Sequence, residues 1–351
     1  MKYTIEKVDL VKSESEIVGF WRENFPGWPV EKYSLFYKNN PFGESLCWVL
    51  KNADNNKIVG TNALFPKRMA INGNTVLAGI AGDLAVAKKH RGHRSAISLQ
   101  QAVNADYKNT DIEFAYATPN VISEKVGQGA GFKVIGRTVR MVKILKSYGY
   151  LKKILRISFL AKLLAEPFDI LLKLKSKEKL YKNSDEYACD IVDSYDERFD
   201  ELWRKAKAQY PVIGERSSEA LNWRFAKCSY KNYHTFTLAR KQSGELLGYI
   251  VYQEIGKNIQ IADCFAVDIG KNLNPLLSKF ILYHRERDID IITFYYFGNN
   301  SIINQVRKYG FVIRADNRSI IVEVDENYPY RDDVLDKNSW HYLDGDNDGD
   351  A

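Results

Sequence analysis

The sequence contains little cysteine: four residues among 351, with no two at the spacing of a C-x-x-C pair or of metal ligands. This scarcity excludes the disulfide framework of a small secreted domain and a zinc site built from cysteine pairs. We expect the thiols to be reduced and partly buried, the protein to be cytoplasmic, and no metal to be bound. They are Cys47, Cys189, Cys228 and Cys264.

Long apolar runs are also missing from the sequence. No stretch approaches the roughly 20 residues of a membrane-spanning helix, and the N-terminal MKYTIEKVDL lacks the apolar core of a signal peptide. The net charge of +7 is small for a chain of 351 residues. It favours an anionic small ligand such as a nucleotide. It is not the dense basic stripe of a nucleic-acid-binding protein, so we expect no nucleic-acid partner.

The rest of the composition is that of a folded globular protein. Apolar residues make up 45% of the chain and aromatic residues 13%, which excludes a disordered polypeptide. The length predicts two domains of ordinary size. At the N-terminus, residues 1–30 predict a helix followed by a loop, with Ser13 or Ser15 as the helix cap and Pro26 near its end.

Residues 81–103 are the most informative stretch, because they predict a strand, a basic turn and a helix in succession. Leu84 and Val86 alternate with small residues, as in a half-buried strand. The turn that follows, residues 88–94, is too polar for a core. Ser95 is a suitable cap for a helix with an apolar stripe.

A helix start presents unpaired backbone N–H groups and a partial positive charge to whatever lies in front of it. Here the same turn also contains Gly92 and several cations. The combination predicts a seat for a phosphate or pyrophosphate group. The alternative interpretation is an ordinary basic loop before a helix.

The order of predicted elements occurs twice along the chain. In each half a strand ends at an asparagine, and a Gly-Phe pair follows eleven residues later: Asn120 and Gly131, then Asn299 and Gly310. Matching elements in matching order predict a duplicated domain. The alternative is chance similarity between two α+β segments.

Residues 146–185, between the two halves, are rich in leucine, isoleucine and lysine. Pro167 is expected to split them into two amphipathic helices. We favour a basic connector whose apolar faces pack on the two domains. The alternative is a helix that lies on an anionic membrane surface, so peripheral membrane contact is the less favoured interpretation.

The last segment, residues 331–351, is acidic. From Asp344 it reads D-G-D-N-D-G, which matches the opening of a calcium-binding loop. The bidentate glutamate that such a loop needs at its twelfth position would fall beyond the last residue. We therefore expect a solvated acidic tail.

The order of these elements resembles the GCN5-related N-acetyltransferase (GNAT) superfamily. In that family a strand, a basic glycine turn and a helix are followed by a second strand, an asparagine, a short helix and a Gly-Phe pair. The family signature Q/R-x-x-G-x-G/A reads Arg91-Gly92-His93-Arg94-Ser95-Ala96 here, with Arg94 in place of the middle glycine. The corresponding turn of the second half, residues 268–275, has no signature and carries one cation.

The resemblance implies an α+β fold: three layers, α/β/α, around a mixed, mostly antiparallel sheet. It also implies two tandem acyl-CoA N-acyltransferase-like domains. The first, residues 1–145, is expected to bind acyl-CoA. The connector 146–185 follows, then a degenerate second domain, residues 186–330, and the acidic tail 331–351.

In this family the motif strand splays from its neighbour and acetyl-CoA or another acyl-CoA enters the gap. The resemblance therefore implies that the strand backbone pairs with pantetheine, that the turn holds the pyrophosphate, and that an asparagine contacts pantetheine or a bound water. The implied cofactor-binding residues are Leu84, Ala85, Val86, Arg91, Gly92, His93, Arg94, Ser95, Ala96 and Asn120.

The implied chemistry is direct attack of an amine on the thioester, which needs a proton acceptor for the amine and a donor for the thiolate. Asp83 is our candidate base, because it lies on the strand beside the expected acyl group. The alternative is that Asp83 only bonds the backbone at a strand bulge. The usual thiol-protonating tyrosine is replaced by Gly127, so the acid is a water, another residue such as Tyr116, or absent.

The favoured function is an acyl-CoA-dependent N-acyltransferase acting on a small amine, such as an amino sugar or its nucleotide-linked form. One alternative is peptidoglycan-type aminoacyl transfer from a charged tRNA, which tandem domains of this fold also perform. Another is a non-catalytic binding protein with a degenerate acyltransferase fold. The sequence predicts no particular oligomeric state.

Overall fold

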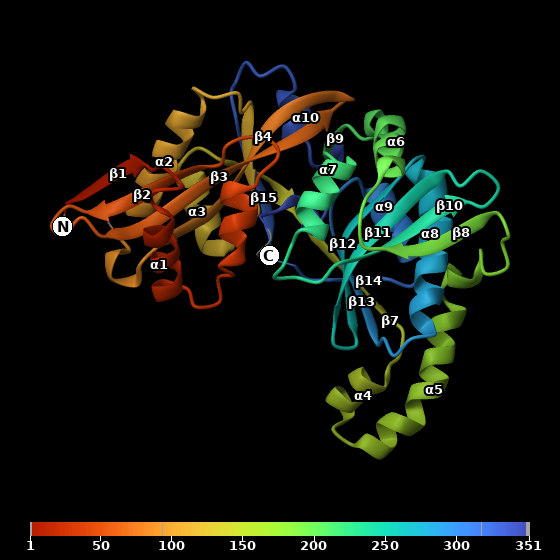
Figure 1. The fold of residues 1–351 in the computed structure, drawn as a ribbon. Coiled ribbons are helices and arrows are strands. Elements are labelled where there is room, and N and C mark those ends of the chain that lie inside the picture. Colours follow the sequence, from red (N-terminus) through yellow and green to blue (C-terminus); the bar gives the residue numbers. More distant parts are fainter. Residues whose placement is uncertain (1, 93, 317, 349–351) are drawn as a thin grey trace.

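The computed structural model describes residues 2–92, 94–316 and 318–348. The chain forms two similar halves that lie side by side, each a twisted sheet with helices on both faces (Figure 1). This is the α/β/α layering of a mixed, mostly antiparallel sheet that the family resemblance implied, and the fold class is confirmed.

The first half is built on a long β3–β4 hairpin with its turn at Asn72 and Gly73. Helix α1 covers one face of the sheet, and α2 and α3 cover the other. An unexpected strand, β1, precedes α1 and pairs with β2. The elements are β1 (Tyr3–Lys7), α1 (Glu14–Asn24), β2 (Leu46–Asn52), β3 (Ile58–Ile71), β4 (Asn74–Val86), α2 (Ser95–Tyr107), β5 (Phe114–Ala117), α3 (Val121–Gly129) and β6 (Lys133–Arg137).

The second half repeats this plan. Helices α6 and α7 cover one face of its sheet, and α8 and α9 cover the other. Its elements are β8 (Tyr187–Val192), α6 (Glu197–Ala206), β9 (Val212–Gly214), α7 (Ser218–Leu221), β10 (His234–Arg240), β11 (Leu246–Ile255), β12 (Asn258–Ala266), α8 (Ile269–Arg285), β13 (Ile291–Gly298), α9 (Asn300–Arg307) and β14 (Val312–Arg314).

Matching local details support the duplication. Asn120 caps α3 and Asn299 caps α9, each through its side-chain oxygen. Arg94 before α2 and Asp268 before α8 both have left-handed backbone conformations. Each half also has a π-helical turn, at Tyr33–Lys38 and Asn222–Ala226.

The two halves exchange their last strands. Strand β7 (Val139–Ile144) pairs with β13 and β14 of the second half. Strand β15 (Ser319–Val324) pairs with β5 and β6 of the first half. The predicted segments 1–145 and 186–330 therefore do not coincide with the two sheets, because each segment contributes its last strand to the sheet of the other half. Alternation in the sequence identifies a strand, but it does not identify the strand's partner.

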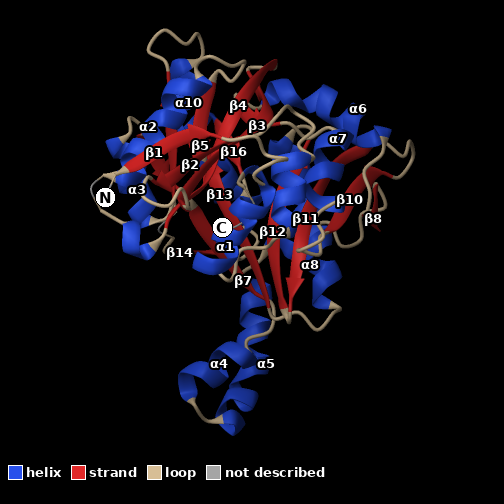
Figure 2. Cartoon of the chain, turned by 60° about the vertical axis from the view of Figure 1, so that its left-hand side comes forward, coloured by secondary structure: helices blue, strands red, loops and turns tan. Residues whose placement is uncertain are grey.

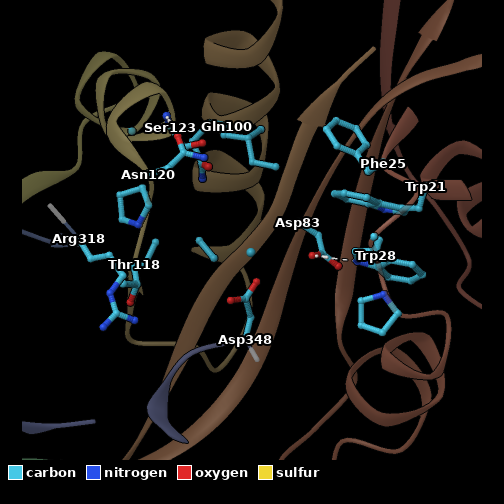
Figure 3. Close-up of a pocket in the computed structure, with 18 of the residues that line it drawn as sticks. Trp21, Phe25, Trp28, Asp83, Gln100, Thr118, Asn120, Ser123, Arg318 and Asp348 are labelled. Atoms are coloured by element: carbon cyan, nitrogen blue, oxygen red, sulfur yellow. Dashed lines mark hydrogen bonds between the residues drawn. The ribbon is translucent and has the colours of Figure 1, made fainter. Parts of the chain in front are cut away.

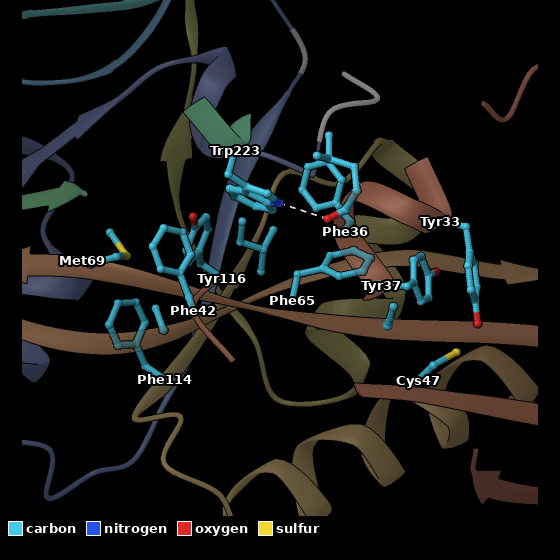
Figure 4. Close-up of a cluster of buried hydrophobic side chains, with 14 of the residues drawn as sticks. Tyr33, Phe36, Tyr37, Phe42, Cys47, Phe65, Met69, Phe114, Tyr116 and Trp223 are labelled. Atoms are coloured by element: carbon cyan, nitrogen blue, oxygen red, sulfur yellow. Dashed lines mark hydrogen bonds between the residues drawn. The ribbon is translucent and has the colours of Figure 1, made fainter. Parts of the chain in front are cut away.

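Two short strands join the halves into one continuous sheet. Strand β9 pairs with β3, and β16 (Trp340–Tyr342) pairs with both β9 and β13. The aromatic core of the first half also receives Trp223 from the second half (Figure 4). Its indole Nε1 donates to the carbonyl of Leu35 at 2.9 Å, and its ring lies against Phe36.

The expectation of a solvated acidic tail is wrong. After α10 (Arg331–Leu335), the chain runs between the halves, and residues 340–343 are buried. The Asp344 carboxylate accepts from Arg318 at 2.9 Å, and Asp346 accepts from Arg216 at 2.6 Å. Both carboxylates therefore form ion pairs with arginine side chains of the same chain. Among the described residues, no cluster of acidic, His or Cys side chains is arranged to hold a metal ion.

The connector is a helical hairpin, α4 (Tyr148–Leu155) and α5 (Ser158–Leu174), that projects from the second half (Figures 1 and 2). Pro167 lies inside α5, and the break between the helices falls at Arg156, which has a left-handed backbone. The hairpin's large apolar side chains are exposed, so the expectation that they pack on the two domains is wrong. No helix in the described ranges has the length and apolarity to span a bilayer.

Candidate active site

Strands β4 and β5 separate partway along their length. They pair in parallel from Ala78 opposite Phe114 to Ile80 opposite Tyr116. Strand β5 then ends at Ala117, whereas β4 continues to Val86. The β4 edge beyond Ile80 therefore faces a gap, as the family resemblance implied for the strand that receives acyl-CoA.

A cavity of about 900 Å³ occupies this gap (Figure 3). One wall comes from α2, α3 and the end of β5, and includes Gln100, Asn120 and Ser123. The opposite wall comes from α1 and the loop after it, and includes Trp21 and Trp28. The two indole rings are stacked, with centroids 5.3 Å apart.

A bulge in β4 places Asp83 between these walls. The register with β3 shifts between Thr61 and Ala63, and Asp83 has φ of 51°. The Thr61 hydroxyl donates to the Asp83 carbonyl at 3.0 Å, which fixes the bulge. Leu84 follows at the cavity lining, and Ala85 and Val86 pair with β3 on their other edge.

The Asp83 carboxylate is occupied by three side-chain donors. Lys32 Nζ lies 2.7 Å from Oδ1, the Tyr37 hydroxyl donates to Oδ2 at 2.6 Å, and Trp28 Nε1 donates weakly to Oδ1 at 3.4 Å. Burial, and then the Asp83 charge, raises the pKa of Tyr37 well above its usual value, so Tyr37 stays a donor. Asp83 is at a bulge, as one interpretation expected, but its carboxylate bonds side chains instead of backbone.

Asp348 reaches the same cavity from the C-terminal segment. Its Oδ2 accepts from Lys32 Nζ at 3.1 Å, and the side chain is 21% exposed. It lies opposite the bulge, close to Gly82 on β4 (Figure 3). Of the two carboxylates that line the cavity, Asp348 therefore has the fewer donors and the better access to a ligand.

Tyr116, the candidate acid, is placed away from the cavity. It is fully buried in the core of the first half and donates to the Asp346 carbonyl at 2.8 Å. Burial raises its pKa well above the usual value. The structure thus corrects the expectation that Tyr116 faces the acyl group.

Gly127, where the family has its tyrosine, does line the cavity. A Cβ atom at Gly127 would lie 2.5 Å from Cδ1 of Ile321, a residue of the exchanged strand β15. The second half therefore fills the space beside this position, and a tyrosine would require Ile321 to move.

The basic turn precedes α2 as predicted, with one correction. Ser95 does not cap the helix: it is the first helical residue, and its hydroxyl donates back to the carbonyl of Gly92 at 2.9 Å. The cap position belongs to Arg94, whose side chain is exposed. The first helical bond runs from Ser98 N–H to the Arg94 carbonyl, so the amide of Ala96 precedes it and is left for a ligand.

Three other predicted residues have clear positions. Gly92 has φ of 119°, which favours glycine. Arg91 Nε donates to the Val86 carbonyl at 2.9 Å and ties the turn to the end of β4. Asn120 uses its side-chain oxygen to cap α3, which leaves its amide nitrogen to serve a ligand. His93 lies outside the described residues.

In the second half the corresponding gap is filled by the chain itself. Strands β12 and β13 pair only as far as Ile261 opposite Phe294. Beyond that point β16 pairs with β13, with Gly298 opposite His341. His341 Nε2 hydrogen-bonds the Cys264 carbonyl of β12 at 2.8 Å, so residues 340–342 bridge the two splayed strands.

The bulge carboxylate also recurs there. Asp263 of β12 accepts from Arg216 at 3.0 Å and from Tyr249 at 2.9 Å, as Asp83 accepts from a cation and a tyrosine. Sequence reasoning missed Lys32, Tyr37, Trp28 and Asp348. No motif marks them, since they come from a loop, a π-helical turn and the C-terminal segment.

The comparisons with known proteins agree with this geometry. The acetyltransferase (GNAT) domain family matches residues 12–135. A search of curated proteins found no match.

Several solved structures share the fold of nearly the whole chain. A GCN5-related N-acetyltransferase from Anabaena variabilis has a TM-score of 0.65 at 15% identity, covering 92% of this chain and 73% of that one. An N-myristoyltransferase of Saccharomyces cerevisiae with bound myristoyl-CoA has a TM-score of 0.57 at 12% identity, covering 91% and 78%. A tandem GNAT protein from the clavulanic acid biosynthesis pathway has a TM-score of 0.55 at 12% identity, covering 92% and 98%. Residues 12–135 are therefore a GNAT acetyltransferase domain, and the chain as a whole has the tandem GNAT fold.

Proposed function

We propose that this protein is an acyl-CoA-dependent N-acyltransferase that uses the first half to bind the donor and transfers the acyl group to a primary amine of a small polar acceptor. The observation that carries the proposal is the gap between β4 and β5, which is open to a ligand. The equivalent gap of the second half is filled by residues 340–342. One acyl-CoA site per chain follows from this difference.

The donor would lie along the β4 edge, with its diphosphate at the start of α2. Backbone groups near Leu84 and Val86 would pair with the pantetheine amides, as an added strand would. The amides of the Arg91–Ala96 turn would hold the diphosphate, because a helix start favours anions. Exposed Arg94 supplies positive charge beside it. The acyl group would then reach the bulge at Asp83.

The acceptor would enter along the opposite wall. The stacked indoles of Trp21 and Trp28 offer an aromatic face, and Asp83 and Asp348 offer carboxylates behind it. Aromatic faces beside carboxylates suit a cationic or sugar-like amine, because such a ligand has apolar C–H faces and polar donors. An amino sugar, free or nucleotide-linked, fits both properties.

The proton balance of the reaction assigns a role to Asp348. The amine nitrogen forms a bond to the thioester carbon, the carbon–sulfur bond breaks, and the proton lost by nitrogen is matched by one gained by the thiolate. Asp83 is engaged by three donors and is poorly placed to accept a proton. Asp348 has fewer donors, so we assign it the amine proton and assign Asp83 the positioning of Lys32. The thiolate takes its proton from solvent.

A thermal-shift experiment tests donor binding. A ligand that binds only the native state raises the melting temperature, so we expect acetyl-CoA or a longer acyl-CoA to raise it. Gly92→Val should abolish this shift, because φ of 119° at Gly92 is unfavourable for valine. Gly270→Val is the matched control: a Cβ there meets nothing within 4 Å, so the shift should persist. An acyl-CoA shift that survives Gly92→Val would contradict the proposed site.

A further inference from the structure

The α4–α5 hairpin carries a concentration of exposed apolar side chains. Twenty large apolar residues are exposed in the described part of the chain, and twelve of them lie on this hairpin. Water-soluble surfaces rarely present so large an apolar patch without a partner. The twelve, which we call the hairpin patch, are Tyr148, Tyr150, Ile154, Ile157, Phe159, Leu160, Leu163, Leu164, Phe168, Ile170, Leu171 and Leu174.

In α5 the large apolar side chains are exposed and small side chains are buried, which is the reverse of an ordinary helical hairpin. The buried side chains of α5 are the small ones, Ala161 and Ala165. At about 100° per residue, the exposed apolar residues of α5 cover one continuous half of the helix. The charged residues lie on the other side. The apolar half of α5 therefore faces outward, although the hairpin has an interior face that could have received it.

Cations border the hairpin patch, and two of the three nearby carboxylates already have partners within the protein. Asp169 accepts from the Ser147 N–H at 2.8 Å, and buried Glu178 pairs with Lys143 at 2.8 Å and with Arg285. Glu166 is the remaining acidic residue of residues 146–185 before Asp185. Within the described residues, none of the bordering cations lies within ion-pair distance of a carboxylate: Lys152, Lys153, Arg156, Lys162, Lys173, Lys175, Lys177 and Lys179.

A pocket of about 400 Å³ continues this surface at the base of α5. Lys175, Arg307 and Lys308 line it, and none of the three is ion-paired within the described residues. Val312, 50% exposed, lies at its edge. An apolar surface thus meets a pocket with several unpaired cations, which suits the boundary between acyl chains and anionic headgroups.

We propose that the hairpin patch binds the surface of an anionic lipid bilayer, with α5 lying in the interface and the cations of its border and of the basal pocket contacting phosphate headgroups. A second copy of the chain is a poorer occupant, because a symmetric contact would bring the unpaired cations of both copies together. The hairpin lies at the far end of the second half from the cavity between β4 and β5 (Figure 1), so the bound state leaves the cavity accessible.

Vesicle co-sedimentation of the full-length protein tests the proposal. We expect binding to mixed phosphatidylcholine–phosphatidylglycerol vesicles that weakens with added salt, and weaker binding to phosphatidylcholine alone. The triple variant Phe159→Ser, Leu163→Ser, Leu174→Ser should lose binding at least about tenfold, because three exposed apolar side chains leave the interface. The matched control is Val11→Ser, Ile122→Ser, Ile255→Ser, three side chains exposed elsewhere, and it should bind as the wild type does.

A charge variant separates the headgroup contact from the apolar one. Lys175→Glu with Lys308→Glu should weaken binding to anionic vesicles about tenfold or more and leave binding to neutral vesicles unchanged. It also keeps the proposal testable if the triple serine variant does not fold, which a circular-dichroism melt would reveal.

Three results would overturn the proposal. The first is equal binding of the wild type to neutral and anionic vesicles. The second is no binding to either. The third is a wild-type dimer in sedimentation equilibrium that becomes a monomer in the triple serine variant, which would assign the hairpin patch to a second copy of the chain.

Discussion

The ammonium of Lys32 lies 2.7 Å from Oδ1 of Asp83, and both side chains are shielded from solvent, with exposed fractions of 0% and 3%. The same ammonium lies 3.1 Å from Oδ2 of Asp348, which lines the cavity. The loop after α1, the bulge of β4 and the C-terminal segment therefore meet at one buried cation. This cation connects the stability of the first half to the geometry of its candidate active site.

Removal of the buried cation should be costly. Lys32→Met leaves Asp83 and Asp348 without their shared partner, and breaking a buried pair from one side typically costs about 3–5 kcal/mol of unfolding free energy. Lys38→Met, which removes the half-exposed partner of Glu14, should cost about 1 kcal/mol or less. Urea unfolding measures both variants. Equal losses would show that the Lys32 pair is no more important than a surface pair.

Substitution of Asp348 should affect turnover, whereas substitution of Asp83 should affect stability. If Asp348 accepts the amine proton, Asp348→Asn should lower kcat by a factor of about 10² to 10⁴ while the acyl-CoA thermal shift remains. Asp83→Asn should lower the melting temperature of the unliganded protein, because Lys32 loses its shorter ion pair. Initial rates with a panel of small amines, measured beside thermal shifts, distinguish the two effects. Unchanged turnover in Asp348→Asn would exclude it as the proton acceptor.

Residues 340–346, which fill the gap between β12 and β13, should be held in place by the ion pair between Asp346 and Arg216. Burial alone would raise the pKa of Asp346, but Arg216 outweighs burial and holds that pKa below its usual value. Asp346→Asn leaves the buried guanidinium with Asp263 as its one carboxylate partner among the described residues, so we expect a loss of about 3 kcal/mol or more in unfolding free energy. Asp332→Asn, at a fully exposed carboxylate, should change it by about 0.5 kcal/mol or less. Comparable effects would contradict the structural role of residues 340–346.

The unfolding free energy should decrease as the pH is lowered, because His341 is buried in the same segment. Burial lowers the pKa of His341 to about 4, below the usual 6.5. Between these values the unfolded state binds a proton that the folded state does not, so the unfolding free energy falls as pH decreases through this range. The full effect for His341 is about 3 kcal/mol. His341→Gln should flatten the dependence of unfolding free energy on pH between 6.5 and 4.5, and an unchanged slope would contradict the assignment.

Local features of the fold could be predicted from the sequence. The strand, basic turn and helix at 81–103, and the repeated order of strand, asparagine and short helix at Asn120 and Asn299, follow from spacing and residue type alone. These features depend on neighbours within a few residues, which a sequence pattern records. The splay of β4 from β5 was implied by the family resemblance and is present.

Relationships between distant segments could not be predicted. Alternation marks β7 and β15 as strands, but their exchange depends on partners more than a hundred residues away. The acidic composition of the last residues favours exposure. In the structure, however, Asp346 and Asp344 form ion pairs with Arg216 and Arg318 between the two halves. Lys32 and Asp83 are 51 positions apart, and no local signal indicates that they pair. The burial of the C-terminal segment explains both why the second gap is closed and how Asp348 reaches the first cavity.

A crystal structure of the protein soaked with acetyl-CoA would show directly which half of the chain binds the coenzyme. We predict density for the diphosphate against the backbone amides at the start of α2, with pantetheine along the β4 edge and residues 340–342 still between β12 and β13. Coenzyme bound between β12 and β13 with the C-terminal segment displaced, or an empty Arg91–Ala96 turn at saturating coenzyme, would contradict it.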